Sequence, residues 1–399
     1  MKFFLFGIFA IGIYLSLYLI YSLTLLLANK LISDKNGFIS SLKAKFNIII
    51  PAHNEEIFLP RLLESLREQE YQSKLFDILV VADNCSDATA EVAVSYGART
   101  LERLDENRIG KGYAIKFALD KTDINLYDAI FIIDADSIAH RQTLKILNQY
   151  IQNGNKIIQC YNGVANPDDS WFTRLMDVSR TIGNEIYEPA KEKLGLSSHL
   201  MGNGMCFRKD AVLEYGWDSF SVGEDWEYYA KIVKAGERVA FAKNARVFHQ
   251  ESATFKQATP QRMRWSSGRF EIIYKYGFGL FYRGLIEKNF KKIHASLPLL
   301  FPNPSLGINI TVICFILSFL LQDSINKNAF MFWFFCLILA HFVIFFSGVL
   351  YTRSKLKNFL SLFIAPVFLI WKMGIDIFSA MGLGRKKWIR TSRKSQKNT

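Results

Sequence analysis

FIIDADS, residues 131–137, joins a hydrophobic run to two aspartates, Asp134 and Asp136, with one residue between them. A short apolar run that ends at a polar turn is typical of a buried strand. Where the chain turns beyond such a strand, two carboxylates can reach a hard divalent cation such as Mg²⁺ or Mn²⁺. The alternative is an ordinary aspartate-rich turn that caps a helix, because Asp136 followed by Ser137 can also do this.

The same order of strand and polar loop recurs along the first half of the chain. Hydrophobic runs predict strands at 46–50, 76–82, 128–133 and 155–160. Amphipathic stretches predict helices at 56–69, 86–96, 111–121 and 140–153. This alternation favours a parallel sheet with helices on both faces, in which ligands bind beyond the carboxyl ends of the strands. Three acidic loops fall at such ends, namely PAHNEE (51–56), DNCSD (83–87) and DADS (134–137).

The first of these loops excludes two common nucleotide-binding classes. A dinucleotide-binding unit needs GxGxxG after its first strand, whereas PAHNEE contains no glycine and is acidic. GKGYA, residues 110–114, lacks the upstream glycine of a Walker A loop. Acidic loops instead suit ribose hydroxyls, base edges and a bound divalent cation.

Two segments of the second half carry further candidate residues. GEDWEYYAKIVKAG, residues 223–236, predicts a helix with Glu224 and Asp225 in its first turn. These acids can complement the helix dipole, or one can act as a general base in the same cleft. TPQRMRWSSGRF, residues 259–270, places Gln261, Arg264 and Trp265 on adjacent helical positions. Arginine can bind a diphosphate in a bidentate manner and tryptophan offers a flat face to a sugar ring, although a snorkelling arginine near a membrane is the plainer interpretation.

Hydrophobic stretches flank this central region. Residues 3–28 contain no charge and are long enough to cross a bilayer. Further span candidates lie at 305–321 and 329–350. A run at 358–382 contains Lys372 and Asp376, which are costly in a span and so need partners or an interfacial position. Because a third full crossing would place the basic tail outside, we expect this run to be re-entrant or interfacial. The expected divisions are an anchor (1–30), a catalytic domain (44–270), an interfacial amphipathic segment (271–296), a membrane region (297–384) and a basic cytoplasmic tail (385–399).

The positive charge and the cysteines indicate the compartment. The net charge of +13 is concentrated in GRKKWIRTSRKSQKNT (384–399) and YTRSKLK (351–357), which border hydrophobic runs. This placement favours cytoplasmic anchoring against anionic lipid and argues against nucleic acid. Five scattered cysteines without CxxC spacing fit a reduced compartment and oppose a disulfide framework or a zinc site. We expect a multi-pass protein of the cell (inner or plasma) membrane, with its catalytic domain in the cytoplasm.

Taken in order across residues 46–270, these motifs resemble those of the membrane-bound family 2 glycosyltransferases, the group that contains cellulose, chitin, hyaluronan and poly-N-acetylglucosamine synthases. Asp83 stands where an acid holds the uracil, GKGYA carries a Lys-Gly element and DAD is similar to the DxD motif. GED takes the place of the TED element, and QRMRW (261–265) matches QxxRW. The resemblance implies an α/β catalytic domain of the GT-A type, which is Rossmann-like with a mixed, mostly parallel sheet, and N- and C-terminal transmembrane helices.

The resemblance also implies roles for particular residues. Asp225 would deprotonate the acceptor hydroxyl, beside Glu224. Nucleotide-sugar binding would involve Pro51, Asn54, Glu55, Asp83, Lys111, Asp134 and Arg264. Diphosphate and acceptor would be held by Gln261, Arg264 and Trp265. A Mg²⁺ or Mn²⁺ ion would bind Asp136 and Asp134, with His249 as a further ligand or simply a strand-end residue.

The implied function is inverting transfer of a sugar from a UDP-sugar to a saccharide or lipid-linked acceptor at the cytoplasmic membrane face, forming β-linkages in cell-surface polysaccharide synthesis. Single transfer to a lipid-linked acceptor is an alternative that the small number of spans favours. An inactive subunit of a polysaccharide export complex is a third, which the intact DAD, GED and QRMRW motifs oppose. Expected partners are membrane lipids and, for a polymer, an oligomer or export subunits, but not nucleic acid.

Overall fold

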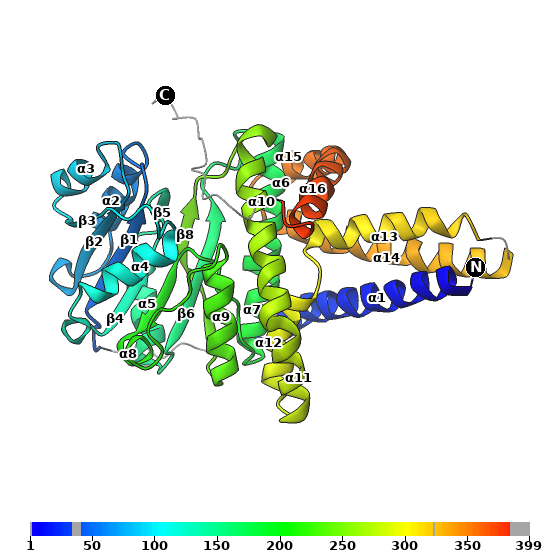
Figure 1. Ribbon diagram of the computed structural model, residues 1–399, viewed down its shortest axis with the longest axis horizontal. Coiled ribbons are helices and arrows are strands. Elements are labelled where there is room, and N and C mark those ends of the chain that lie inside the picture. Colours follow the sequence, from blue (N-terminus) through cyan, green and yellow to red (C-terminus); the bar gives the residue numbers. More distant parts are fainter. Residues whose placement is uncertain (1, 34–40, 322–323, 384–399) are drawn as a thin grey trace.

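The computed structural model of the chain describes residues 2–33, 41–321 and 324–383. A sheet domain occupies one end of the molecule, and long helices project from it at the other end (Figure 1). The basic tail expected at 385–399 lies outside the described residues.

An eight-stranded sheet of order β3-β2-β1-β4-β7-β6-β8-β5 forms the centre of the domain. Its strands are β1 (Phe46–Ala52), β2 (Phe76–Asp83), β3 (Arg99–Arg103), β4 (Ala129–Ile132), β5 (Ser137–Ala139), β6 (Ile157–Val164), β7 (Met205–Arg208) and β8 (Val239–His249). β1, β2, β3 and β4 are mutually parallel, as are β6 and β8, whereas β7 runs antiparallel to both of its neighbours and β5 runs antiparallel to β8. The expected mixed, mostly parallel sheet is confirmed. The sequence predicted β1, β2, β4 and β6, but not the short strands β3, β5 and β7 or the long strand β8.

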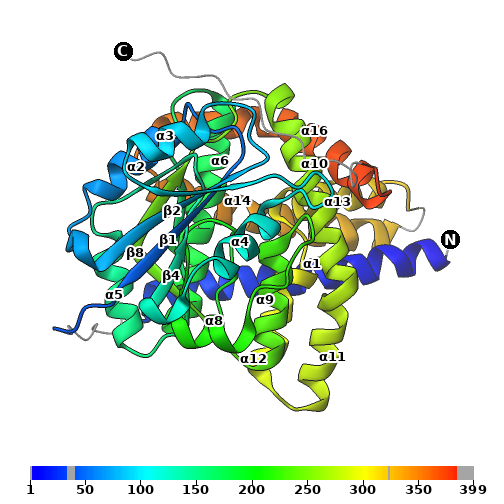
Figure 2. The same ribbon diagram turned by 60° about the vertical axis from the view of Figure 1, so that its left-hand side comes forward.

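Helices cover both faces of this sheet (Figure 2). One core packs α2 (Leu59–Arg67), α3 (Thr89–Ser95) and α5 (Thr143–Gln152) against the sheet, and a second core packs α4 (Lys111–Asp120), α8 (Lys209–Tyr215) and α9 (Glu224–Ala235) against its other face. Two short 3₁₀ turns, η1 (Ser73–Leu75) and η2 (Ile124–Leu126), lead into β2 and β4. Because β1, β2 and β4 are parallel neighbours, the loops after them meet at one edge of the sheet.

Two long helical rods separate the sheet from the projecting helices. The first runs through α6 (Trp171–Thr181), the π-helical turn η3 (Ile182–Tyr187) and α7 (Glu188–Lys193). The second is α10 (Phe255–Ile272), which continues through the π-helical turn η4 (Ile273–Gly277) into α11 (Phe278–Ile286). Gly348 allows helix α14 (Ser324–Tyr351) to approach η3 closely, since a Cβ there would lie 2.4 Å from Ile182.

The amphipathic segment expected at 271–296 is a helical hairpin instead of one continuous segment. α11 turns back into α12 (Phe290–Leu300) at Lys288, whose φ of 49° is left-handed. The two helices pack closely at Gly284, where a Cβ would lie 2.8 Å from Ile293. The Tyr229 hydroxyl donates to the carbonyl of Ala295 over 2.9 Å, so α12 packs on the sheet domain while α11 projects from it (Figure 1).

The remaining helices are α1 (Lys2–Leu31), α13 (Pro304–Ser318), α14 (Ser324–Tyr351), α15 (Lys355–Ser361), the 3₁₀ turn η5 (Leu362–Ile364) and α16 (Ala365–Ala380). Within the described residues, three helical stretches are long and apolar enough to cross a membrane, namely Phe3–Leu31, Asn326–Tyr351 and Lys355–Ala380. The first two match the spans expected at 3–28 and 329–350.

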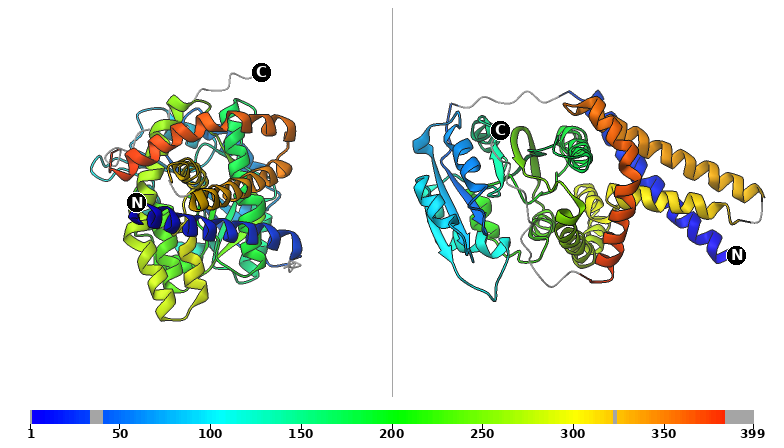
Figure 3. Two further views of the ribbon diagram at one scale, coloured as in Figure 1. Left: turned by 90° about the vertical axis from the view of Figure 1, so that its right-hand side faces the viewer. Right: turned by 90° about the horizontal axis from the view of Figure 1, so that it is seen from above.

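The other two expectations for the membrane region need more detail. α13, at 15 residues, is shorter than the span expected at 305–321, and at 1.5 Å per residue it reaches only about 22 Å. α13 is a candidate membrane span only when it is taken together with α12, from which it is separated by a 70° bend. α16 lies across the base of α13 and α14, whereas α1, α13 and α14 extend away from the sheet domain together (Figure 3).

Candidate active site

A cavity of about 1520 Å³ opens at the loop edge of the sheet and continues between the projecting helices. Of the residues singled out in the sequence, all but Asn54 line it: Pro51, Glu55, Asp83, Lys111, Asp134, Asp136, Glu224, Asp225, His249, Gln261, Arg264 and Trp265. The cavity therefore brings together residues from seven separate loops, helices and strand ends. Its far end is lined mainly by apolar side chains.

Asn54 connects two loops of the site. Its backbone is left-handed, with φ of 57°, and its amide oxygen accepts a hydrogen bond from the backbone N–H of Ser86 over 2.7 Å. The neighbouring Glu55 N–H donates to the Thr89 hydroxyl over 2.8 Å. These bonds hold the PAHNEE loop against the DNCSD loop. Asn54 therefore connects the two loops and does not line the cavity.

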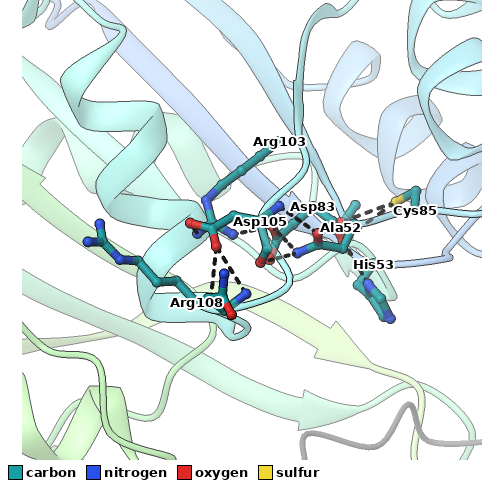
Figure 4. A network of polar contacts seen from close by, with 9 residues as sticks. Ala52, His53, Asp83, Cys85, Arg103, Asp105 and Arg108 are labelled. Atoms are coloured by element: carbon teal, nitrogen blue, oxygen red, sulfur yellow. Dashed lines mark hydrogen bonds and ion pairs between the residues drawn. The ribbon is translucent and has the colours of Figure 1, made fainter.

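Asp83 is buried and paired with a residue that the sequence did not reveal (Figure 4). The guanidinium of Arg103, at the end of β3, donates to Asp83 over 2.6 Å and to Asp105 over 3.0 Å. Burial raises the pKa of Asp83, against the opposing effect of Arg103. The backbone carbonyl of Asp83 also contacts His53 Nδ1 over 2.7 Å, so these contacts hold the loop after β2 in place.

The DAD turn is held by side chains from the other half of the sheet. The Asn203 amide oxygen accepts from the backbone N–H of Asp134 over 3.0 Å, and its NH₂ group donates to Ser137 and Asn162. Lys111 forms an ion pair with Asp134 and donates to the carbonyl of Gly202 over 2.6 Å. Burial acts to lower the pKa of Lys111, but nearby carboxylates outweigh it and raise that pKa. Asp134 is thus neutralised by a lysine.

The surroundings of Asp136 fit a divalent cation. His249 lies beside the DAD turn because it pairs with Ser137 between β5 and β8. Its Nδ1 is 3.1 Å from the Asn162 amide oxygen, which only accepts, so Nδ1 carries a proton. The other nitrogen, Nε2, is buried, has no hydrogen-bond partner among the described residues and lies 3.5 Å from the Glu251 carboxylate. When the ring is neutral, Nε2 would present a lone pair to a metal ion.

Imidazole nitrogen and carboxylate oxygen are both suitable ligands for Mn²⁺. Across the described residues, no group of three or more His, Cys, Asp or Glu side chains is arranged to hold a metal ion. The remaining ligands would therefore have to come from a bound substrate or water.

Glu224 and Asp225 open helix α9 and face the glycine-rich turn before β7. A Cβ on Gly202, whose φ is +78°, would lie 3.2 Å from Asp225 Oδ2, so only glycine allows this close approach. Burial raises the pKa of Glu224, and repulsion from Asp225 adds to it, bringing it to about 7. Burial also raises the pKa of Asp225, although the backbone N–H of Trp226 opposes this. Two carboxyl groups in a buried space with raised pKa values are well suited to proton transfer.

The QRMRW segment lies in α10, along the opposite wall. The Arg262 guanidinium stacks over Trp265 with its centre 4.5 Å from the ring centroid and donates to Glu251 over 2.7 Å. Burial acts to raise the pKa of Glu251, but Arg262, His249 and Arg180 outweigh it and lower that pKa. Gln261 is buried, and its amide oxygen has no hydrogen-bond partner among the described residues, so it can accept one from a ligand.

Three further lining residues were missed in the sequence: Arg180 of α6, Glu188 of α7 and His199. The Glu188 carboxylate accepts from Lys191 over 2.8 Å and contacts His199 Nδ1 over 3.0 Å, while the His199 ring stacks on Trp226. Burial acts to raise the pKa of Glu188, but Lys191 and His199 outweigh it and lower that pKa. No local motif marks these residues, because they meet the site only through the folding of the α6–α7 rod.

Comparison with known proteins identifies the family. The chain belongs to the Glycosyltransferase like family 2, whose model matches residues 44–268, more than half of the chain. Residues 44–268 therefore form a domain of this glycosyltransferase family. The N-terminal anchor and the helices after residue 268 lie outside the matched region.

Individual relatives are more distant. The chain is 23% identical over 242 residues to the probable glycosyltransferase YdaM of Bacillus subtilis, covering 58% of this chain and 57% of that protein. It is 24% identical over 254 residues to the beta-monoglucosyldiacylglycerol synthase of Trichormus variabilis, covering 58% of this chain and 50% of that protein. The match thus spans only about half to three fifths of these relatives' lengths.

Among solved structures, the mannosyltransferase PcManGT from Pyrobaculum calidifontis, in complex with GDP-Man and Mn²⁺, is similar over nearly the whole chain. The TM-score is 0.57 with 17% sequence identity, and the match covers 93% of this chain and 99% of the other. At this identity the likeness shows the fold alone.

Proposed function

We propose that the protein transfers a sugar from a UDP-sugar, with inversion, to a lipid or lipid-linked acceptor at the cytoplasmic face of the membrane. The observation that carries this proposal is the continuity of the cavity. It runs from Asp83 and Asp134 at the sheet edge, past Asp225, to the projecting helices. A donor and a long amphipathic acceptor can thus meet in one space.

The far end of the cavity is lined by apolar side chains of helices that we place in the membrane. They are Leu25 of α1, Ile308 of α13, Ile338, Phe342 and Phe345 of α14, Phe359 of α15, Leu362 and Phe363 of η5, and Ala365, Phe368 and Leu369 of α16. A free saccharide has little to gain from such walls, whereas a lipid chain packs well against them. The relative from Trichormus variabilis, by its name, makes a glycosylated diacylglycerol, which agrees with this acceptor class.

In this reaction the acceptor hydroxyl lies between Asp225 and the anomeric carbon of the donor. Asp225 takes the hydroxyl proton as the new C–O bond forms, and the bond to the nucleoside diphosphate breaks on the opposite face of the sugar. A single displacement of this kind inverts the anomeric centre and gives a β-linkage from an α-linked donor.

The donor is held by the loop edge of the sheet. Asp83, fixed by Arg103, faces the base, while Lys111 and Arg264 offset the charge near the diphosphate. Asp136 would hold Mg²⁺ or Mn²⁺, with His249 beside it, and such an ion stabilises the departing diphosphate when it is bound.

The directions of the helices support the membrane placement. α1, α13 and α14 extend together from the sheet domain, whereas α10, the α11–α12 hairpin and α16 run across them (Figures 1 and 3). The exposed aromatic rings of α11 and its flanks, Tyr274, Phe278, Tyr282 and Phe290, have Lys275 and Arg283 beside them, as expected at a lipid surface. We infer that α16 also lies at the interface, which leaves the sheet domain and the basic tail on the cytoplasmic side.

A saccharide acceptor that grows into a cell-surface polysaccharide remains the alternative, and Trp265 is its best support because the ring lines the cavity. An inactive subunit is disfavoured because Asp134, Asp225 and Arg264 all converge on one cavity. An oligomer or an export partner would be required only if the product were a polysaccharide that has to cross the membrane.

The test incubates the full-length protein, in micelles of a detergent without sugar groups, with Mn²⁺, radiolabelled UDP-sugars and a membrane lipid extract. We expect label in the organic phase, with UDP released in equal amount. Ile338→Trp, which blocks the apolar end, should abolish this transfer, whereas Leu339→Trp on the exposed side of α14 should not. Label found only in water-soluble product, or unaffected by Ile338→Trp, would overturn the lipid acceptor.

A further inference from the structure

Arg180 occupies the junction between the catalytic and apolar ends of the cavity. It lies in the last turn of α6, where its neighbours Leu175, Met176 and Val178 also line the cavity. Its guanidinium lies 5.8 Å from the ring centroid of Trp265, in the QRMRW segment. The side chain is therefore within reach of a ligand that spans both ends.

Arg180 differs from two neighbouring arginines in what it contacts. Arg262 is bound to Glu251, and Arg269 donates to the carbonyls of Pro298 and Phe301 over 3.1 and 2.6 Å. Among the described residues Arg180 forms neither an ion pair nor a hydrogen bond, and its guanidinium lies against the ring of Trp265. Arg180 lines the cavity, so its N–H donors are available to an acceptor that enters it.

The surroundings compensate this charge only in part. Burial lowers the pKa of Arg180 and Arg262 adds to this, while Glu251, and to a smaller extent Asp225 and Asp134, oppose it. Glu251 is itself bound to Arg262. The side chain of Arg180 is half-buried and lines the cavity without a directly paired anion among the described residues, so the site favours an anionic ligand.

We propose that Arg180 binds the phosphate of the acceptor, so that the acceptor is an anionic lipid with a phosphate and a free hydroxyl in its head group. This inference rests on the lipid acceptor proposed above and specifies its chemical class. The planar guanidinium matches phosphate in a bidentate manner. Held there, the lipid chain extends along Leu175 and Met176, and its hydroxyl reaches towards Asp225, which takes the proton during transfer.

The diphosphate of the donor is the other possible source of phosphate. It is already opposed by Lys111 and Arg264 and by the cation expected at Asp136, on the side of the cavity near the sheet. The two sources predict different kinetics, since a residue that binds the acceptor changes the KM of the acceptor and leaves that of the donor unchanged.

The experiment compares three acceptors in sugar-free detergent micelles with the full-length protein, Mn²⁺ and its UDP-sugar. Phosphatidylglycerol and a polyprenyl-diphosphate-linked monosaccharide carry phosphate and a hydroxyl, and glucosyldiacylglycerol carries hydroxyls only. We expect the wild-type protein to use at least one phosphate-bearing lipid and to use the neutral lipid poorly. Arg180→Gln should lower kcat/KM for the phosphate-bearing lipid roughly ten- to hundredfold and leave the KM of the donor unchanged.

Arg180→Lys, which keeps the charge, should restore part of the loss. Arg174→Gln is the matched control, because Arg174 is on the same helix but pairs with Asp168 outside the cavity. Binding of phosphatidylglycerol is also measured without donor, by native mass spectrometry, so that an inactive variant still gives a result. Of these variants, only Arg180→Gln should bind phosphatidylglycerol more weakly.

Two results would overturn the inference while leaving the lipid acceptor intact: equal use of neutral and phosphate-bearing lipids, or an Arg180→Gln variant that raises the KM of the donor instead. If no lipid is labelled and a water-soluble saccharide is, the proposed function itself fails.

Discussion

The two ends of the cavity are built in different ways. At the sheet edge, Asp83, Asp134 and their neighbours sit on loops that follow adjacent parallel strands, and each is fixed by a charged or amide partner. At the apolar end, the walls come from α1, α14 and α16, near opposite ends of the chain. The polar end is therefore specified by short motifs, and the apolar end by long-range packing. Changes at the first should damage donor binding, and changes at the second should damage only acceptor use.

The largest effect is expected where the two ends meet. Asp225→Asn keeps the shape of the side chain but removes the base, so kcat should fall roughly a hundred- to ten-thousandfold while UDP binding persists. The rate of UDP release measures kcat, and calorimetry with Mn²⁺ present measures the binding of UDP. Asp218→Asn serves as control, since Asp218 pairs with Lys231 at the surface and does not line the cavity. Near-normal turnover of Asp225→Asn would show that another group is the base.

The polar end should also contribute to the stability of the domain. Arg103→Met leaves the Asp83 carboxylate buried without its partner, which should cost about 3–5 kcal/mol in free energy of unfolding. Thermal unfolding of the purified protein measures this loss. Arg99→Met on the same strand is the control, because Arg99 is exposed and only donates to the carbonyl of Lys121. Equal stability of the two variants would mean that the Asp83–Arg103 pair is not needed to hold the loop.

Substitutions of the two aspartates of the DAD turn, both at the polar end of the cavity, should have different effects. Asp136→Ala should weaken the apparent affinity for Mn²⁺ roughly ten- to hundredfold. Asp134→Ala should raise mainly the KM of the donor, because it releases Lys111. Titration of activity with Mn²⁺ at saturating donor measures the first effect. If both variants shift Mn²⁺ affinity equally, the division of roles is wrong.

The fall of kcat/KM at acidic pH should reflect protonation of the carboxyl pair Glu224 and Asp225. Burial raises both pKa values, that of Glu224 to about 7, and a carboxyl group is protonated below its pKa. kcat/KM should therefore be retained above pH 7 and fall roughly tenfold per unit below it. Glu224→Gln removes the neighbouring negative charge and should move this fall to lower pH. A fall that does not move would place the titrating group elsewhere.

The motifs of the polar end were found in the sequence because each is local. FIIDADS already contains a strand, its turn and both carboxylates, and the parallel order of β1, β2 and β4 brings three such loops together. The apolar lining could not be read in this way. Arg180 and Glu188 lie in a helical rod whose sequence carries no motif, and they reach the cavity only because the rod packs between the sheet and α14.

The structure adds details that the sequence interpretation did not contain. Asn54 has a left-handed backbone, and its side chain contacts Ser86. The amphipathic segment at 271–296 is reversed at Lys288, and α12 packs on α9. Lys372 and Asp376, which need partners in a span, form an ion pair with each other.

The smallest effect is expected from a change beside the Lys372–Asp376 ion pair, and it also tests whether the two ends of the cavity are independent. The Ser266 hydroxyl of α10 donates to Asp376 over 2.8 Å and accepts from Lys372 over 3.0 Å, joining the QRMRW helix to α16 across 110 residues of sequence. Ser266→Ala leaves the two charges paired, so it should cost only about 1 kcal/mol of stability. Because it loosens the wall beside Trp265, it should raise the KM of the acceptor and leave the KM of the donor unchanged.

Ser267→Ala is the matched control, because the Ser267 hydroxyl is buried but has no hydrogen-bond partner among the described residues. It should change neither constant. If Ser266→Ala instead raised the KM of the donor, the α10–α16 contact would belong to the polar end, and the two ends of the cavity could not be varied separately.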